Sequence, residues 1–373
     1  MQGAQAVYIH IPFCARRCYY CSFISYGCLH SSHLTDYLQA LIREIKQSPT
    51  LLPLSSLYIG GGTPSLLEPQ HLRDILRCFN FSADCEISME ANPESLSFNK
   101  LSGYRRLGVN RLSIGMQSLN DNELHMLGRA HNAKEACRAV NEAKACGFDN
   151  VNIDLIYGLP GQASSDFTRS LRRALELAPQ HISLYALSLE KDCYLSKEIE
   201  SGRVREILAD EATNCYEEAG ELLAKRGYVQ YEISNWARPS FECRHNLTYW
   251  QQNKWSAYGL ASYAFNGCCR ISNCTDLDSY IGRLCVGESA IGDIEKISKD
   301  DLLAEGIILA LRLNKGADLG YLSKRYETDA MAKYKSAITF SLEAGLLEQE
   351  GCIIKLTSRG RLLSNEVFWR FLP

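Results

Sequence analysis

The chain has 373 residues, of which 46% are hydrophobic and 22% charged, and its net charge is −3. This length allows one large domain plus a smaller one, and the near-neutral charge gives no sign of a nucleic-acid partner or an anionic membrane. No apolar run approaches the roughly 18 residues of a membrane-spanning helix, and the first residues lack the pattern of a signal peptide, so we expect a cytoplasmic protein without a transmembrane segment.

Six short apolar segments alternate with helical patterns in the first half of the chain. The expected strands are 6–11, 56–60, 85–90, 111–116, 150–156 and 181–187. The expected helices between them lie near 69–78, 98–106, 132–146 and 165–177. Six βα-like repeats predict an α/β fold with a parallel sheet and crossover helices. Periodicity alone does not choose between an open doubly wound sheet and a partial barrel.

The second half of the chain does not continue the regular alternation of strand and helix patterns. Beyond residue 190 the pattern loosens, with one clear helix at 210–226, and we treat 191–297 as an extension of a core domain at 1–190. From about residue 298 a helix carries Tyr334, Ile338 and Leu342 at a spacing of four, and a hairpin pattern turns near Glu350 and Gly351. Residues 298–373 therefore predict a small winged-helix-like α+β domain. Its acidic and basic residues balance, which favours packing or protein contacts over DNA binding.

Three cysteines stand close together directly after the first expected strand. Cys14, Cys18 and Cys21 form a CxxxCxxC pattern, whereas most of the 16 cysteines are scattered singly. Three thiolates leave one position of a metal centre without a protein ligand. A structural zinc site normally closes with four ligands, and no second CxxC pair is present. The pattern therefore favours an iron–sulfur cluster with one open iron over zinc or packed thiols.

This pattern after a first βα strand resembles the motif of the radical S-adenosylmethionine (SAM) superfamily. In that superfamily the open iron chelates the amino and carboxylate groups of SAM, and an electron from the cluster cleaves SAM to a 5′-deoxyadenosyl radical. The resemblance implies a [4Fe–4S] cluster on the three cysteines, bound SAM, an electron donor for the cluster and a partial (β/α)6 barrel.

Polar residues stand at the expected carboxyl ends of the strands, where α/β folds build their active sites. A glycine-rich segment at 60–64 would let the backbone approach a ligand closely. Each residue by itself is typical of a turn, a solvated side chain or an ion pair; together they resemble the SAM site of the coproporphyrinogen-oxidase-like branch. The residues that match this site are Tyr8, Tyr20, Gly61, Gly62, Thr63, Glu90, Gln117, Arg129 and Asp154. Among them, the two tyrosines match contacts near the adenine.

Residues 8–14 and 60–65 are similar to the branch that contains the oxygen-independent coproporphyrinogen III oxidases and the HemW-type haem chaperones. Three departures separate this chain from the oxidases. Phe23 stands where the oxidase pattern has a further cysteine, and no N-terminal arm precedes the cluster, since the first cysteine of the motif is residue 14. Residues 245–250, His-Asn-Leu-Thr-Tyr-Trp, match the HNxxYW motif of HemW proteins.

The resemblance implies a haem chaperone that binds haem and transfers it to acceptor haemoproteins such as respiratory cytochromes. His245 would be the haem ligand, because a neutral imidazole suits haem iron, and Tyr249 and Trp250 would flank the macrocycle. A structural histidine is the alternative for His245. Family members can form homodimers and meet membrane-bound acceptors, which would give a peripheral membrane contact.

Other functions remain open at this point. The main alternative is oxidative decarboxylation of coproporphyrinogen III by an oxygen-independent oxidase. A radical SAM methyltransferase or a haem-degrading enzyme of the same branch comes next, and a zinc-binding module comes last.

Overall fold

The computed structural model describes residues 5–27, 31–50, 52–191, 193–205 and 208–372. A twelve-stranded sheet forms the body of the molecule, and six neighbouring parallel strands form its middle. In sheet order these are β1 (Gln5–Ile11), β4 (Leu54–Gly61), β5 (Phe81–Ala91), β6 (Arg111–Gln117), β7 (Val151–Tyr157) and β8 (His181–Ala186). All six strands that the sequence predicted are confirmed, in a sheet order that follows the chain.

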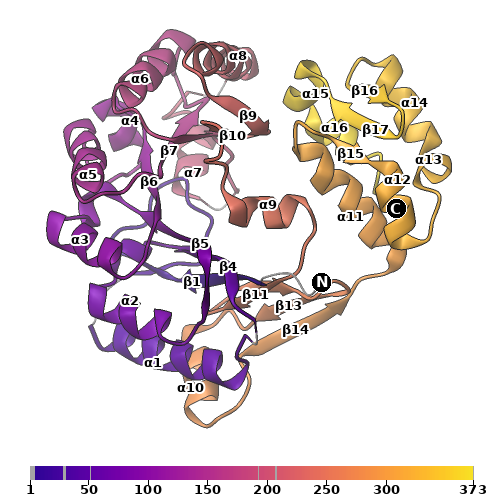
Figure 1. Cartoon of the computed structure of the whole chain (residues 1–373). Helices are drawn as coiled ribbons and strands as arrows, with labels where there is room; N and C mark the ends of the chain where they lie inside the picture. The colour runs from indigo at the N-terminus through magenta and orange to yellow at the C-terminus, as the bar shows by residue number, and fades with distance from the viewer. Residues whose placement is uncertain (1–4, 28–30, 51, 192, 206–207, 373) are drawn as a thin grey trace.

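Helices follow these strands and lie along the outside of the curved sheet (Figure 1). They are α1 (Ser31–Gln47), α2 (Pro69–Leu76), α3 (Phe98–Arg106), α4 (Asp121–Met126), α5 (Ala133–Ala145), α6 (Ser164–Glu176) and α8 (Ala209–Lys225). The helix α7 (Tyr194–Glu200) instead lies beside Tyr19, to whose carbonyl Leu195 N donates at 2.9 Å. In α5, Asn132 and Glu135 form a capping box at the first turn, and the buried face carries small residues such as Ala136 and Ala143. Because helices cover the outside, the inside of the sheet is left to hold a site.

The sheet is wider than the sequence predicted. Beyond β8 lie β10 (Asn235–Ala237) and β9 (Val229–Glu232); beyond β1 lie β11 (Trp255–Tyr258), β12 (Tyr263–Phe265), β13 (Cys269–Asn273) and β14 (Ile291–Lys296). Two more helices, α9 (Arg244–Trp250) and α10 (Leu277–Cys285), belong to this part. The added strands are short and mostly antiparallel, and all six residues of β14 are exposed. Such strands carry no continuous apolar run, so periodicity gave no sign of them.

The strands β14 and β9 form the two edges of the sheet, and no pairing between them is found in the described part of the chain. The parallel strands therefore form a partial barrel. This agrees with the α/β class and the partial barrel that the sequence resemblance implied.

The C-terminal part has a core of its own, which includes Leu303, Ile307, Ile354 and Phe371. A three-stranded sheet in the order β15, β17, β16 packs with short helices, as the winged-helix-like pattern predicted. The elements are α11 (Lys299–Arg312), β15 (Ala317–Asp318), α12 (Leu319–Tyr326), α13 (Ala330–Lys333), α14 (Lys335–Glu343), β16 (Leu347–Glu350), β17 (Ile353–Leu356), α15 (Ser358–Leu362) and α16 (Ser364–Phe368). The domain boundaries at residues 190 and 297 stay a prediction.

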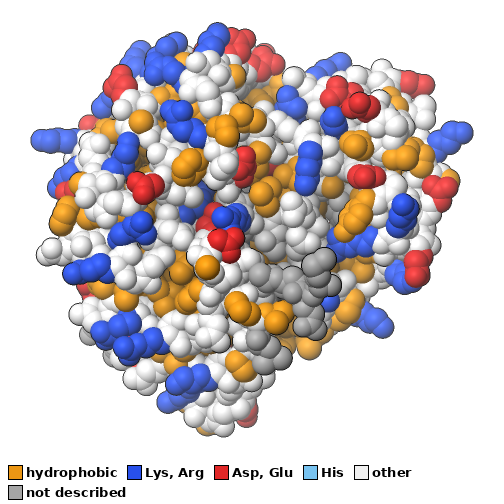
Figure 2. All heavy atoms as spheres, viewed as in Figure 1, with side chains coloured by type: hydrophobic (Ala, Val, Ile, Leu, Met, Phe, Trp, Pro, Cys, Tyr) orange, Lys and Arg blue, Asp and Glu red, His pale blue; other side chains and the backbone are white. Residues whose placement is uncertain are grey.

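Two features of the molecule bear on its partners. On the face drawn in Figure 2, acidic and basic side chains are mixed over the C-terminal part, so that face presents no continuous basic surface. Among the described helices, none combines the length and the apolar character that crossing a bilayer requires.

Candidate functional site

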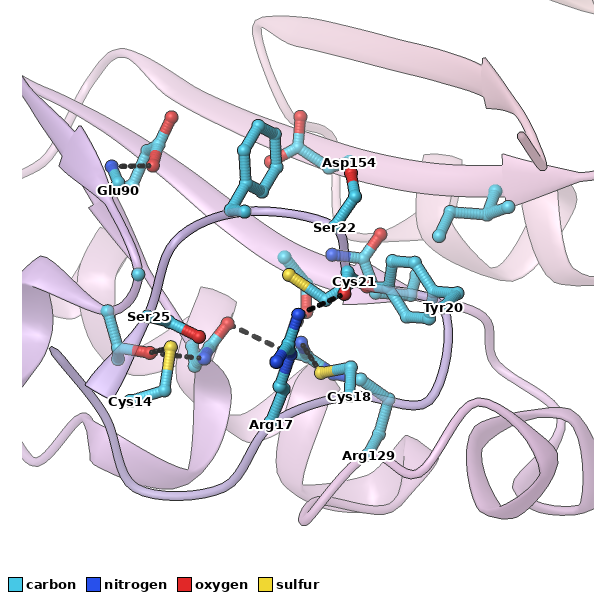
Figure 3. A pocket seen from close by; sticks show the side chains of 18 of the residues that line it. Cys14, Arg17, Cys18, Tyr20, Cys21, Ser22, Ser25, Glu90, Arg129 and Asp154 are labelled. Carbon is cyan, nitrogen blue, oxygen red and sulfur yellow. Dashed lines mark hydrogen bonds between the residues drawn. The ribbon is translucent and has the colours of Figure 1, made fainter. Parts of the chain in front are cut away.

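The first of the three clustered cysteines, Cys14, ends the short strand β2 (Phe13–Cys14), and the other two lie on the loop that leads to its partner strand β3 (Tyr26–Gly27). Backbone hydrogen bonds hold this loop at several points. Tyr26 N donates to Pro12 O at 2.7 Å, and Tyr19 N donates to Leu127 O at 3.0 Å. The three thiols are free and partly exposed, and Figure 3 shows them around one opening. The loop therefore presents three sulfur ligands at the carboxyl end of β1.

A cavity of about 490 Å³ opens beside this loop, and we call it the cysteine cavity. Its wall comes from the carboxyl ends of the central parallel strands and from the glycine-rich turn that follows β4. The predicted residues that line it are Cys14, Cys18, Cys21, Tyr20, Gly61, Gly62, Thr63, Glu90, Gln117, Arg129 and Asp154. The fold thus brings eleven of the thirteen predicted site residues to one place; Tyr8 and His245 lie elsewhere.

The surroundings of the sulfurs fit an iron–sulfur cluster. Arg129 Nη1 donates to Cys18 Sγ at 3.2 Å, and Thr63 Oγ1 donates to Cys14 Sγ at 3.5 Å, so both sulfurs face groups that stabilise a thiolate. Burial raises the pKa of the Cys14 and Cys21 thiols, and a bound cation would offset that cost. No three ligating side chains in the described ranges converge on one metal ion.

Two carboxylates face the cysteine cavity from β5 and β7, the strands on either side of β6. Glu90 accepts hydrogen bonds from Tyr58 Oη at 2.9 Å and from Gly61 N at 3.0 Å. Burial raises the pKa of Glu90 to about 7, although the Tyr58 hydrogen bond opposes the shift. Asp154 accepts from Ser113 Oγ at 2.9 Å, and burial raises its pKa as well. Partly buried carboxylates of this kind can bind an ammonium group or ligand hydroxyls.

Asn92 organises the site, although the sequence argument did not select it. Arg129 Nη2 donates to Asn92 Oδ1 at 2.7 Å and to Gly115 O at 3.0 Å, and Asn92 Nδ2 donates to Thr63 Oγ1 at 3.0 Å. Asn92 therefore connects the arginine beside Cys18 with the threonine beside Cys14. The available signal was its position two residues after Glu90, directly past the end of β5.

The glycine-rich turn packs tightly against the cysteine loop. A Cβ atom on Gly62 would lie 2.6 Å from Phe13 O and 2.9 Å from Cys14 Sγ. Only glycine allows the two segments to approach this closely. The requirement for Gly62 is therefore steric, and it fixes the place of the first cysteine.

A second cavity, of about 890 Å³, adjoins the first, and we call it the aromatic cavity. Ser22, Phe23, Gly61 and Glu90 line both cavities. The aromatic side chains in its wall come from β1, the cysteine loop, α9, β11 and β12. They are Tyr8, Phe23, Tyr249, Trp250, Trp255, Tyr263 and Phe265. A flat apolar ligand would fit such a wall better than a charged one.

Tyr8 and His245 lie outside the lining of the cysteine cavity. Tyr8 lines the aromatic cavity and not the cysteine cavity, together with Gly61 and Glu90, which line both. His245 is only 1% exposed; its Nδ1 lies 3.0 Å from Ser56 Oγ and its Nε2 lies 2.7 Å from Tyr249 Oη. With both nitrogens hydrogen-bonded, His245 occupies the place of a structural histidine behind the cavity wall. Of the HNxxYW segment, Tyr249 and Trp250 line the cavity itself.

Known proteins resemble this chain over nearly its whole length. Residues 8–174 match the radical SAM superfamily, and residues 297–363 match the HemN C-terminal domain. A protein of Bacillus subtilis named "Heme chaperone HemW" is 32% identical over 99% of this chain and 99% of its own. A protein of that name from Mycobacterium tuberculosis is 35% identical over 97% of this chain and 93% of its own.

Among solved structures, coproporphyrinogen III oxidase (HemN) of Escherichia coli superimposes with a TM-score of 0.87 at 24% identity. The match covers 99% of this chain and 90% of the oxidase. At this identity, the likeness shows a common fold.

Proposed function

Because this chain belongs to the HemW family within the radical SAM superfamily, we propose that it is a haem chaperone that binds haem and transfers it to acceptor haemoproteins such as respiratory cytochromes. The observation that carries the proposal is the full-length similarity to relatives of that name. The aromatic cavity supports it, because its volume and its wall suit a porphyrin macrocycle.

The proposal includes a resident [4Fe–4S] cluster on Cys14, Cys18 and Cys21, and SAM in the cysteine cavity. When bound, the cluster would supply an open iron for SAM and a source of single electrons. Arg129 would stabilise the Cys18 thiolate through its guanidinium. The remaining residues of the chain would bind and orient SAM.

Each of those binding roles follows from the chemistry of the side chain. Ionised Glu90 would hold the amino group of SAM, and Asp154 would accept hydrogen bonds from the ribose hydroxyls. Gly61 and Gly62 would admit the ligand close to the backbone, with Thr63 beside them. Tyr20, Gln117 and Arg129 complete the wall of the cysteine cavity.

Haem would occupy the aromatic cavity, with Tyr249 and Trp250 of the HNxxYW segment in its wall. In the described conformation His245 holds Tyr249 through its Nε2. Direct ligation of iron by His245, the role that we predicted from the motif, would require this hydrogen bond to break and the ring to leave its buried place.

The alternative function is oxidation of coproporphyrinogen III, the reaction of the structural neighbour HemN. One residue argues against it. Phe23, which replaces a cysteine of the oxidase pattern, is 66% exposed and stands between the two cavities. It places an apolar ring, and not a thiol, where the two cavities meet.

The first experiment measures both activities on one anaerobically reconstituted preparation whose iron and sulfide content is known. With SAM, a reductant and coproporphyrinogen III, we expect no decarboxylated vinyl product by chromatography. With haem and an apo-cytochrome, we expect binding and transfer, followed by the spectrum of the acceptor. Vinyl product would establish the oxidase instead, and zinc in place of iron would contradict the cluster.

Several partners belong to the same proposal. An electron donor would reduce the cluster, the acceptor would be a haemoprotein, and the chaperone would be cytoplasmic with a peripheral membrane contact where the acceptor is membrane-bound. A homodimer is part of this proposal, to be measured by light scattering.

A further inference from the structure

His10 lies in the wall of the aromatic cavity, and one nitrogen of its imidazole has no hydrogen-bond partner among the described residues. The residue lies near the end of β1, and its ring lines the cavity wall. Its Nδ1 lies 3.0 Å from Tyr8 Oη, whereas its Nε2 is buried and has no hydrogen-bond partner among the described residues. A buried polar atom without a partner destabilises the fold, so a fold that retains one leaves it available to something else.

We propose that Nε2 of His10 is the axial ligand of haem iron in the aromatic cavity. The inference rests on the proposed function, because it takes haem as the molecule that this chain carries. Imidazole nitrogen is a common protein ligand of haem iron, and the cavity of about 890 Å³ lies in the range of known ligand sites. Aromatic rings of the wall would then cover the faces of the macrocycle.

The neighbours of His10 favour the tautomer and the neutral form of the imidazole that binding to iron requires. For Nε2 to offer a lone pair, Nδ1 must carry the proton and donate it to Tyr8 Oη, which is the arrangement that orients metal-binding histidines. Burial lowers the pKa of His10 to about 4, and the Ile24 backbone opposes this shift without cancelling it. The imidazole is therefore neutral at pH 7. Tyr8 is itself held in place by stacking on Tyr58, with 6.2 Å between the ring centroids.

Gly61 provides the space for this ring. A Cβ atom at position 61 would lie 2.8 Å from His10 Cε1, and the backbone there has a φ of +117°, which disfavours any other residue. The same glycine lines both cavities. The geometry therefore places the proposed haem ligand directly beside the SAM site.

The two histidines differ in what they can offer to an iron. His245 has hydrogen-bond partners at both ring nitrogens and is 1% exposed. His10 has Tyr8 Oη beside its Nδ1, and its Nε2 has no hydrogen-bond partner among the residues that the structure describes. Trp250, which also lines the cavity, has an indole Nε1 that is buried without a partner in the described part of the chain, and this N–H could donate to a ligand oxygen.

Spectroscopy of haem bound to the reconstituted full-length protein tests the proposal. We expect His10→Ala to lose the absorption and resonance Raman signature of histidine-ligated haem, with about tenfold weaker binding or more. Free imidazole should restore the signature in this variant, because it fills the space of the missing ring. His245→Ala and the exposed control His125→Ala should keep the wild-type signature.

Other outcomes contradict either the proposed ligand or the proposed function. If His10→Ala keeps the wild-type signature, or if only His245→Ala loses it, His10 is not the ligand. If the wild-type protein with its cluster binds no haem, the proposed function itself fails. Should His10→Ala not fold, Tyr8→Phe gives the second test: it removes the acceptor of the Nδ1 proton, so the iron–histidine stretching frequency must shift, and an unchanged frequency overturns the proposal.

Discussion

Replacing Glu90 by glutamine should stabilise the cluster-free protein at alkaline pH. Burial raises the pKa of Glu90 from 4.5 to about 7 in the folded chain. The folded pKa is above the unfolded one, so folding disfavours the ionised carboxylate. The resulting loss of stability is absent below pH 4.5, grows between pH 4.5 and 7, and is complete above pH 7. At 1.36 kcal/mol per pH unit, it amounts to about 3 kcal/mol.

Glutamine removes this cost but also changes the hydrogen bonds. Its one carbonyl oxygen can accept from Tyr58 Oη or from Gly61 N, and its amide NH2 then faces the other donor, which costs about 1 kcal/mol. Glu90→Gln should therefore be more stable than the wild type by about 2 kcal/mol at pH 8.5, and less stable by about 1 kcal/mol near pH 4.5.

Urea unfolding of the cluster-free protein, followed by circular dichroism at several pH values under reducing conditions, measures the difference in stability at both pH values. Titrating groups that do not interact with Glu90 cancel in the difference between variant and wild type. Glu221→Gln is the control, because Glu221 and its partner Lys225 are both 73% exposed, so the difference should stay near zero at every pH. A Glu90→Gln difference that does not change with pH would refute the reasoning. The same variant should bind SAM more weakly.

Three further substitutions test the cysteine cavity. Gly62→Ala should push Cys14 aside and lower the iron content of the reconstituted protein, whereas Gly220→Ala, with no atom within 4 Å of the new Cβ, should stabilise α8 by about 1 kcal/mol in urea unfolding. Arg129→Gln removes the charge beside Cys18 and leaves buried acceptors unpaired, so the free energy of unfolding should fall by about 2–3 kcal/mol. Asp154→Asn should retain the iron content but weaken SAM binding in calorimetry; unchanged SAM affinity would remove Asp154 from the site.

The sequence by itself determined the central sheet and most of the cysteine cavity. The central strands carry apolar residues at short, regular intervals, such as Leu112, Ile114 and Met116, so their bounds could be read within a few residues, as in 111–116 against Arg111–Gln117. Because the carboxyl ends of parallel strands meet at one edge, residues such as Glu90 and Asp154 could be placed together without a structure. The spacing of the three cysteines was enough to predict a shared metal site, because all three follow directly after the first strand.

Only the tertiary structure decided the outer strands, the aromatic cavity and the state of each histidine. Two outer strands join the central sheet through distant segments, as when Ala6 of β1 meets Trp255 of β11 and Ser183 of β8 meets Asn235 of β10, and pairing of that kind leaves no local pattern. Whether an imidazole nitrogen is occupied depends on partners far away in the chain. Ser56 lies 189 residues from His245 and occupies its Nδ1, whereas His10 keeps a free nitrogen because no described side chain reaches it. A sequence motif can indicate a candidate histidine ligand, but only the packing of the folded chain decides which imidazole nitrogen is free to bind iron.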